Sequence, residues 1–275
     1  MRMALIQQSA GPDRDANLKR AVANMRLACE AGARMAVFSE LATTRFFPQF
    51  RDDASWVATA EPIPGPTSSL IATTAAETRM VTIFNMYELG DDGRRYDASP
   101  VFDADGRLLG VTRMVHIADF TGFHEQGYYT PGDHGAPVYE TRVGRVGVAV
   151  CYDRHYPEYM RALGEKGAQV VAIPQAGCLG EWPEGLYEAE VRTAAFQNGY
   201  FIGLCNRVGV EDRLTFAGES FACDPEGRVI ARGGQLTEEI VLADLNLESC
   251  DQSTARRLFW RDRRPQLYAG WLSGA

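Results

Sequence analysis

The stretch GRVGVAVCYDRHYPEYMRALGEKGAQVVAIPQ, residues 144–175, guides our interpretation of the whole chain. Its apolar run at 146–150 predicts a buried strand, and the residues from Pro157 onward predict an amphipathic helix. A second apolar run, 170–173, predicts another buried strand. Strand, sharp turn, helix and strand in this order indicate an α/β fold with Cys151 at the turn.

Two hypotheses account for Cys151. Near the N-terminal end of the following helix, unpaired N–H groups and the helix dipole favour a thiolate, which would make this thiol a nucleophile. A cysteine that follows a valine-rich strand is also commonly a buried core residue. This stretch alone does not decide between the two.

The same alternation of strands and helices continues along the chain. The expected strands are residues 3–7, 35–38, 80–87, 96–102, 108–117 and 200–206, and the expected helices are 15–31, 67–78 and 186–198. Residues 215–245 alternate like antiparallel strands. In the expected strand 108–117, side chains alternate between two faces, so Met114 and His116 share one face and Arg113 lies on the other.

Composition restricts the kind of protein. The chain has 275 residues, 45% hydrophobic and 23% charged, and no linker divides it, so we expect one domain over residues 1–275. A formal net charge of −8 without a basic run argues against a nucleic-acid partner. We find no signal-peptide pattern and no apolar stretch of membrane-spanning length, and therefore expect a cytoplasmic protein with no membrane partner.

Cysteine and histidine spacing gives no sign of a metal site. The six cysteines form no zinc pair, the four histidines are scattered, and no phosphate-binding glycine loop is present. We therefore expect no cofactor. Residues 249–275 form a polar, arginine-rich tail that we expect to pack on the body or on a partner subunit.

Several motifs occur in one order along nearly the whole chain. They are FSEL around Glu40, GRLLGVTRMVHI at 106–117, GFHEQGYYTPGD at 122–133, CYDRHYPE around Cys151, and the later NRVG, FAGES and DPEGRV. With these motifs the chain resembles the nitrilase superfamily of carbon–nitrogen hydrolases, and looks most like the N-carbamoyl amine and ω-amidase branches. The resemblance implies a four-layer α-β-β-α sandwich, paired with a second subunit into an α-β-β-α-α-β-β-α homodimer.

The resemblance also implies roles for individual residues. Glu40 matches the general base, Cys151 the nucleophile that forms a thioester or thioimidate, and Glu125 a second glutamate that positions its neighbours. The backbone N–H of Tyr152 would donate to the oxyanion. The implied substrate is a small-molecule amide, carbamoyl or related carbonyl compound. Pocket residues expected near Cys151 or in the loops at the end of the sheet are Tyr152, His155, Gln175, Ala176, Trp182 and His116.

One catalytic position departs from the family pattern. Where the motif Tyr-Arg-Lys-x-His has its lysine, this chain has Met114, and its only lysines are Lys19 and Lys166, which we place far from the site. Arg113 should point to the opposite face of its strand unless a bulge re-aims it. The usual catalytic triad is therefore incomplete.

Three hypotheses remain for the altered site. In the first, the protein is an amidase-like hydrolase whose cation comes from Arg113, His116 or the substrate. In the second, the site serves acyl transfer or amide formation; in the third, a pseudoenzyme binds a ligand or partner. A laboratory substitution at 114 would also explain the methionine. Because Glu40, Glu125 and Cys151 are all present, we favour an enzyme, in which the two neighbouring carboxylates should push at least one pKa upward.

Overall fold

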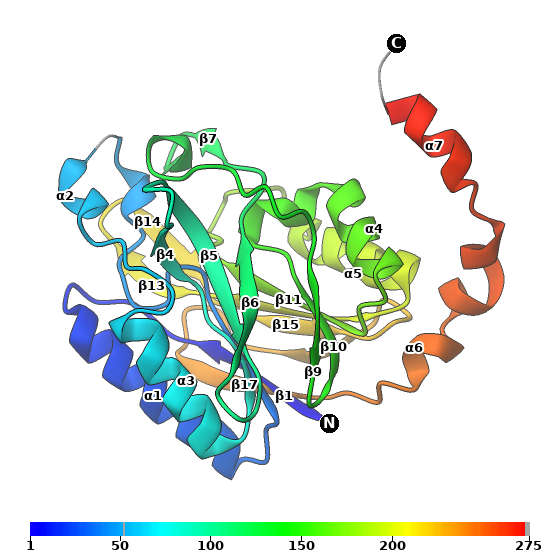
Figure 1. Ribbon diagram of the computed structural model, residues 1–275, viewed down its shortest axis with the longest axis horizontal. Helices are drawn as coiled ribbons and strands as arrows, with labels where there is room; N and C mark the ends of the chain where they lie inside the picture. Colours follow the sequence, from blue (N-terminus) through cyan, green and yellow to red (C-terminus); the bar gives the residue numbers. More distant parts are fainter. Residues whose placement is uncertain (52, 273–275) are drawn as a thin grey trace.

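Two β-sheets pack face to face at the centre of the molecule, and helices cover their outer faces (Figure 1). The computed structural model describes residues 1–51 and 53–272. The layers therefore follow the order helix, sheet, sheet, helix. This is the four-layer α-β-β-α sandwich that the resemblance to the nitrilase superfamily implies.

The first sheet contains seven strands in the order β17-β1-β2-β3-β5-β4, with β6 also paired to β5. Strands β1, β2 and β3 are parallel neighbours, and the other pairings are antiparallel. The strands of this sheet are β1 (Arg2–Gln7), β2 (Met35–Phe38), β3 (Val81–Ile83), β4 (Met86–Leu89), β5 (Arg95–Phe102), β6 (Leu108–Arg113) and β17 (Glu239–Asp244).

The second sheet contains six strands in the order β16-β15-β12-β11-β10-β9. Strands β10, β11 and β12 are parallel, so their carboxyl ends lie at one edge. The strands are β9 (Val138–Thr141), β10 (Gly144–Val148), β11 (Val170–Gln175), β12 (Phe201–Asn206), β15 (Phe221–Cys223) and β16 (Val229–Arg232). Two short ribbons complete the β-structure: β7 (Asp119–Phe120) with β8 (Phe123–His124), and β13 (Val208–Glu211) with β14 (Leu214–Ala217).

Each sheet buries one face against the other sheet and one face against helices. Leu5 and Val37 of the first sheet share a core cluster with Val146 and Val148 of the second. On the outer faces, α1 and α3 pack on the first sheet, and α4 and α5 pack on the second. The α-helices are α1 (Arg14–Glu30), α2 (Ala54–Val57), α3 (Pro66–Thr78), α4 (Pro157–Glu165), α5 (Leu186–Asn198), α6 (Ser249–Gln252) and α7 (Pro265–Leu272).

Single turns of other helix types occur at several chain reversals. Three of them are 3-10 turns within the body, one is a π-helical turn, and one is a 3-10 turn in the tail. They are η1 (Phe47–Gln49), η2 (Glu125–Gly127), η3 (Cys151–His155), η4 (Ala255–Phe259, the π-helical turn) and η5 (Trp260–Asp262).

Two predicted strands are shorter than expected. The predicted strand 80–87 divides into β3 and β4, because the Asn85 side chain accepts from the Leu41 N–H at 2.6 Å and donates to Asp97 at 2.5 Å. The predicted strand 108–117 ends at Arg113. The Met114 N–H still donates to the Asp97 carbonyl, but the N–H groups of Val115 and His116 bind the Asp153 carboxylate instead of a neighbouring strand. In the second case a side chain distant in the sequence replaces ladder hydrogen bonds.

The C-terminal residues leave the body as an arm (Figure 1). Its first part is anchored: Cys250 and Ala255 are buried, and the Thr254 N–H donates to Glu226 at 2.7 Å. Arg256 donates to the Gly164 carbonyl at 3.1 Å, while α7 extends away from the sheets. The first part of the tail therefore contacts the body, and residues 273–275 lie outside the described residues.

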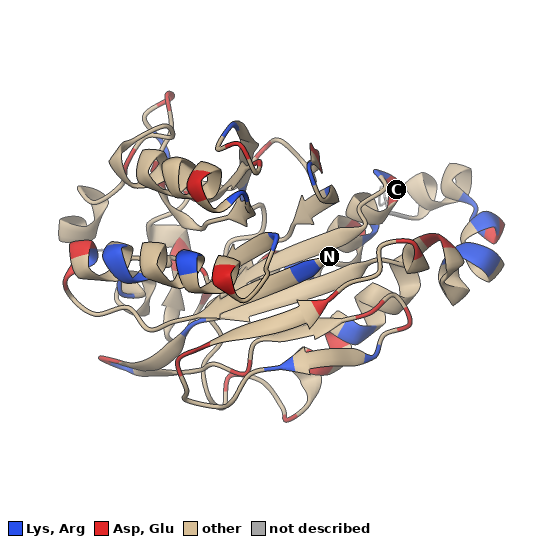
Figure 2. Cartoon of the chain, turned by 90° about the horizontal axis from the view of Figure 1, so that it is seen from below, with Lys and Arg blue, Asp and Glu red and all other residues tan. Residues whose placement is uncertain are grey.

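Charged residues concentrate on the helices, the turns and the arm, and the middle of the strands is nearly free of them (Figure 2). Within residues 1–51 and 53–272, no helix is long and apolar enough to cross a membrane. Four of the buried charged residues follow the carboxyl ends of β2, β10 and β12: Glu40, Asp153, Arg154 and Arg207.

Candidate active site

Cys151 lies at the sharp turn between β10 and η3, and its residue is 4% exposed. Its backbone φ is 42°, a left-handed conformation that is costly for a residue with a side chain and is found mainly where the fold imposes it. Gln175, at the end of the neighbouring strand β11, donates to the Cys151 Sγ at 3.1 Å. Adjacent parallel strands thus bring the thiol and the amide together.

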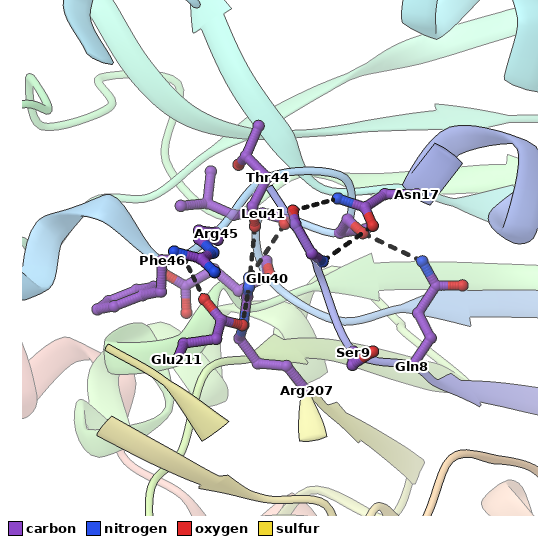
Figure 3. Close-up of polar contacts among 12 residues, drawn as sticks. Gln8, Ser9, Asn17, Glu40, Leu41, Thr44, Arg45, Phe46, Arg207 and Glu211 are labelled. Atoms are coloured by element: carbon purple, nitrogen blue, oxygen red, sulfur yellow. Dashed lines mark hydrogen bonds and ion pairs between the residues drawn. The ribbon is translucent and has the colours of Figure 1, made fainter. Parts of the chain in front are cut away.

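Glu40 follows β2 of the opposite sheet, and a buried arginine fixes its backbone (Figure 3). Arg207 Nη1 donates to the carbonyl oxygens of Glu40 and Leu41 at 2.8 and 3.0 Å, and Nη2 donates to the Thr44 carbonyl at 2.9 Å. Glu211 Oε1 accepts from Arg207 Nη2 at 2.5 Å, and both side chains are buried. Leu41, like Cys151, has a positive φ, here 45°.

Two further carboxyl groups lie beside Glu40. Glu125 comes from η2, where its Oε2 accepts from the Ala118 N–H at 3.2 Å. Asp97 comes from β5, where its Oδ1 accepts from Asn85 Nδ2 at 2.5 Å. All three carboxyl residues are 0% exposed, and their charges act on one another. We call Glu40, Asp97 and Glu125 the carboxyl cluster.

Burial dominates the electrostatics of this cluster. Burial, followed by the charge of Glu125, raises the pKa of Glu40 to about 8. Burial also raises the pKa of Asp97 and of Glu125 well above their ordinary values. The expected upward shift among neighbouring carboxyls is therefore confirmed, and Asp97, which sequence analysis did not single out, strengthens it.

Of the two hypotheses for Cys151, the one that favours a thiolate through the helix end is not supported by the electrostatics of the site. Burial, followed by the charges of Glu40 and Glu125, raises the thiol pKa well above its ordinary value, and the charge of Arg154 opposes them only in part. The turn that follows Cys151 is a single 3-10 turn, and α4 begins only at Pro157. Desolvation and two neighbouring carboxyls therefore outweigh the effect of the helix end.

Met114 is fully buried in the apolar core that also contains Cys151. Its neighbour Arg113 takes another direction: its guanidinium holds Glu88 with two hydrogen bonds of 2.7 Å and lies 3.8 Å from the centre of the Tyr96 ring. The expected outward orientation of Arg113 is confirmed. This arginine does not supply a cation to the carboxyl cluster.

Four other residues expected in the pocket lie near the Cys151 turn. Tyr152, His155 and Trp182 are in ring contact, with centroid distances of 5.0 Å from His155 to each of the other two. Ala176 follows β11 and is buried in the same apolar cluster that Tyr152 packs against. His155 Nδ1 is also 2.7 Å from Glu190 Oε1. These side chains gather around the turn that carries Cys151.

His116 lies beside the turn but is engaged elsewhere. Its Nδ1 is 2.7 Å from Asp153 Oδ1, and its ring stacks on Tyr156 with centroids 3.4 Å apart. Arg154, which sequence analysis missed, donates from Nη1 to the Cys151 carbonyl and to Gln175 Oε1, each at 2.9 Å. Its place in CYDRHYPE, three residues after the cysteine, was the available signal.

A cavity of about 590 Å³ opens beside the loop after β11. Trp182 lines it together with Cys178, Tyr187, Asn206 and Glu219. Because Trp182 also contacts the His155 ring, the cavity adjoins the aromatic side chains around the Cys151 turn. Among the residues that the structure describes, no group of three or more His, Cys, Asp or Glu side chains is arranged to hold a metal ion.

The fold and the site together define a class: an α-β-β-α sandwich with a buried cysteine at a strand-to-helix turn, faced by carboxyl groups from the opposite sheet. Comparison with known proteins identifies the family. The model of the carbon-nitrogen hydrolase family matches residues 2–255. The chain therefore belongs to the carbon–nitrogen hydrolase family, and its predicted resemblance to the nitrilase superfamily is confirmed.

Individual relatives agree with this assignment. N-carbamoylputrescine amidase of Solanum lycopersicum is 31% identical over 97% of this chain and 93% of its own length. Omega-amidase NIT2 of Xenopus tropicalis is 29% identical over 98% and 96%. The crystal structure of a carbon-nitrogen hydrolase from Helicobacter pylori matches with a TM-score of 0.92 and 29% identity, over 99% of this chain and 98% of that one.

The Arg207–Glu211 pair should be essential for stability. We expect Arg207→Met to lower the free energy of unfolding by about 3–5 kcal/mol, because it leaves the Glu211 carboxylate buried without its partner. Urea unfolding followed by tryptophan fluorescence measures this. The matched control is Arg45→Met, since Arg45 and Asp212 form a 3.1 Å pair with side chains 34% and 37% exposed. We expect the control to cost about 0–1 kcal/mol. Equal losses in both variants would contradict the structural role assigned to the buried pair.

Proposed function

We propose that this protein is a cysteine-dependent hydrolase that cleaves a non-peptide C–N bond, in an amide or N-carbamoyl group of a small molecule. The observation that carries the proposal is the Cys151 thiol, held at a strained turn by Gln175 and faced by the Glu40 carboxyl. Membership of the carbon–nitrogen hydrolase family supports it, as do relatives named as amidases.

In the proposed reaction, Glu40 is the general base and Cys151 is the nucleophile. The Glu40 carboxylate accepts the thiol proton while Sγ attacks the carbonyl carbon, and the C=O electron pair moves to oxygen. When the C=O bond forms again, the C–N bond breaks and the leaving nitrogen takes the proton from Glu40. Water then gives a proton to Glu40 and attacks the thioester, releasing the acid and the thiol. The Tyr152 backbone N–H is the proposed donor to the negative oxygen.

Glu125 and Gln175 position this machinery. Glu125 is bound to the Ala118 N–H and sets the charge around Glu40, and Gln175 orients the sulfur. The proposed pocket wall consists of Tyr152, His155, Ala176 and Trp182.

Because Met114 provides no positive charge for the oxygen, transfer of the acyl group to an amine instead of water is a second candidate. It would use the same thioester and would yield an amide in place of an acid.

Cys151→Ala should abolish turnover, because no other described group takes the place of the nucleophile at this turn. Ammonia release from a panel of amides and N-carbamoyl amines measures this, together with mass spectrometry for an adduct on Cys151. Cys29→Ala is the matched control, since Cys29 lies in α1 and donates to the Thr78 carbonyl. Turnover that survives Cys151→Ala would rule out the hydrolase. Failure of every electrophile to modify Cys151 would favour a binding protein.

Activity should rise with pH through about 8. Only the ionised Glu40 carboxylate accepts the thiol proton, and burial raises its pKa from 4.5 to about 8. We therefore expect kcat/KM to increase between about pH 6.5 and pH 9, with an apparent pKa that belongs to the whole carboxyl cluster. A flat profile over this range would contradict the assignment of Glu40 as the base.

Unfolding measurements provide a control that needs no substrate. The raised pKa means that folded Glu40 keeps a proton that the unfolded chain loses above pH 4.5. Its contribution to stability is therefore complete below pH 4.5 and is lost as the pH rises towards 8. Glu40→Gln should show a smaller fall in the free energy of unfolding over this range than the natural protein.

We also propose that the protein is a homodimer that uses its C-terminal arm. Leu258, Leu267 and Trp271 expose apolar side chains there, at 52%, 47% and 70%. Such a cluster on a projecting arm fits a second copy of the chain. Sedimentation velocity should show Leu267→Asp shifting towards monomer, whereas Leu27→Asp, at an exposed site on α1, should not. A monomeric natural protein at micromolar concentration would overturn this proposal.

A further inference from the structure

The carboxyl cluster has an excess of buried acceptors. The oxygens that Glu40 and Asp97 leave without a regular hydrogen bond interact with each other and with the Cys151 thiol. Oε1 of Glu125 has no hydrogen-bond partner among the described residues. The Tyr129 hydroxyl, in a residue 5% exposed, is also without such a partner. All three carboxyl charges act on this hydroxyl and, after burial, raise its pKa. Buried polar groups are normally satisfied, so these atoms point to a ligand.

The cations nearest to the cluster are already engaged. Arg207 is paired with Glu211 and donates to three backbone carbonyls. Arg154 donates to the Cys151 carbonyl and to Gln175, and Arg113 is paired with Glu88. His116 is bound to Asp153. The positive charge that would complement the three carboxyl groups therefore has to come from the ligand.

The residue paired with Asp97 on the adjacent strand segment is apolar. Strands β5 and β6 are antiparallel, with Ala98 opposite Arg113, so Asp97 lies opposite position 114. The Met114 N–H donates to the Asp97 carbonyl at 2.9 Å, which confirms this pairing just beyond the end of β6. An aspartate and a methionine thus stand side by side in the region of Glu40 and Cys151, and neither side chain brings a positive charge to it.

We propose that the group cleaved in this site is itself cationic: the amidinium or guanidinium group of a small molecule. The inference rests on the proposed function, because it uses Cys151 as the nucleophile and Glu40 as the base. A planar amidinium or guanidinium presents several N–H donors in a fixed fork, which suits a set of buried carboxylate oxygens. The Tyr129 hydroxyl adds one more acceptor at the same place.

Charge development during the reaction favours this substrate. Attack on a neutral amide places negative charge on oxygen beside three carboxyl groups, where it is repelled. Attack on an amidinium moves the C=N electron pair onto a positively charged nitrogen, so the tetrahedral intermediate has neutral nitrogens. The site then needs no cation of its own, because no negative charge develops on the substrate. The carboxylates stabilise the positive charge of the bound amidinium and of the S-bound intermediate that forms when ammonia leaves.

The reaction balances as follows. Glu40 takes the thiol proton, Sγ bonds to the central carbon, and Glu40 returns the proton to one nitrogen, which leaves as ammonia when the C–N bond breaks. Water loses a proton to Glu40 and adds to the S-bound carbon. The proton of the new hydroxyl passes to the released ammonia, which becomes ammonium. At the same time C=O forms, the C–S bond breaks, and sulfur takes back the proton from Glu40. The net change converts an amidinium and water into an amide and ammonium, or a guanidinium and water into a urea and ammonium.

Binding of such a cation should be coupled to proton release. The groups around the ligand are Glu40, Asp97 and Glu125, the Tyr129 hydroxyl and the Cys151 thiol, with Arg207, Asp153 and Glu181 contributing charge from further away. Burial raises the pKa of all three carboxyl groups, and a bound cation favours their ionised form. Affinity for the cation should therefore rise with pH.

The test compares isosteric pairs that differ in charge: acetamidine with acetamide, and methylguanidine with N-methylurea. We expect ammonia release from the cationic member to exceed that from the neutral member by about 10²-fold in kcat/KM, the effect typical of one lost or gained charge contact in a buried site.

Met114→Lys should reverse the preference, because the ammonium occupies the place of the substrate cation. Asp97→Asn should lower only the activity on the cations. Leu27→Lys and Asp212→Asn, on the surface, are the matched charge controls.

Binding to Cys151→Ala gives a readout independent of turnover. Calorimetry in two buffers of different ionisation enthalpy should show acetamidinium binding with proton release and acetamide binding more weakly. Equal or tighter binding of acetamide overturns the inference, whether or not the natural protein is active. Faster turnover of the amides overturns the inference and leaves the proposed hydrolase intact. If no compound reacts with Cys151 of the natural protein, the proposed hydrolase fails, and with it the cleavage of a cationic group.

Discussion

The buried guanidinium of Arg207 connects the two sheets at the point where the chemistry is concentrated. It follows β12 of the second sheet and binds the backbone just after β2 of the first, so the turn that carries Glu40 is fixed relative to the strands that carry Cys151. Its own charge is balanced by Glu211. A buried arginine needs such a complete set of partners to offset its desolvation, and that requirement defines the local geometry.

In the site around Arg207, burial affects the pKa values of the side chains more than neighbouring charges do. Three carboxyl groups and a thiol share a region with almost no solvent exposure, and desolvation is the largest cause of every pKa shift among them. Two residues make the acidic side chains of the site outnumber its cations: Met114 contributes no positive charge, and Asp97 adds a third carboxyl group. The strained backbone at Leu41 and Cys151 shows that the fold imposes this arrangement.

Much of the architecture could be predicted from local patterns. The alternation of apolar runs with amphipathic helices located the strands around Cys151 and the helix at 186–198, which agrees with α5. The errors occur where long-range contacts compete with local propensity. Asn85 breaks one predicted strand through its bonds to Leu41 and Asp97, and Asp153 ends another by binding the backbone of Val115 and His116. Periodicity carries no information about such contacts.

The sequence by itself determined an α/β fold through its periodicity, which depends only on residues close together in the chain. Its motifs, through the resemblance they carry, indicated the family, the layered sandwich, and Cys151, Glu40 and Glu125 as candidates. It also showed the methionine at 114. Only the tertiary structure decided that Asp97 joins Glu40 and Glu125, that Arg113 turns to Glu88, and that the Cys151 thiol has a raised pKa. Those properties depend on desolvation and on charges from segments far apart in the chain, which are set only when the two sheets pack together.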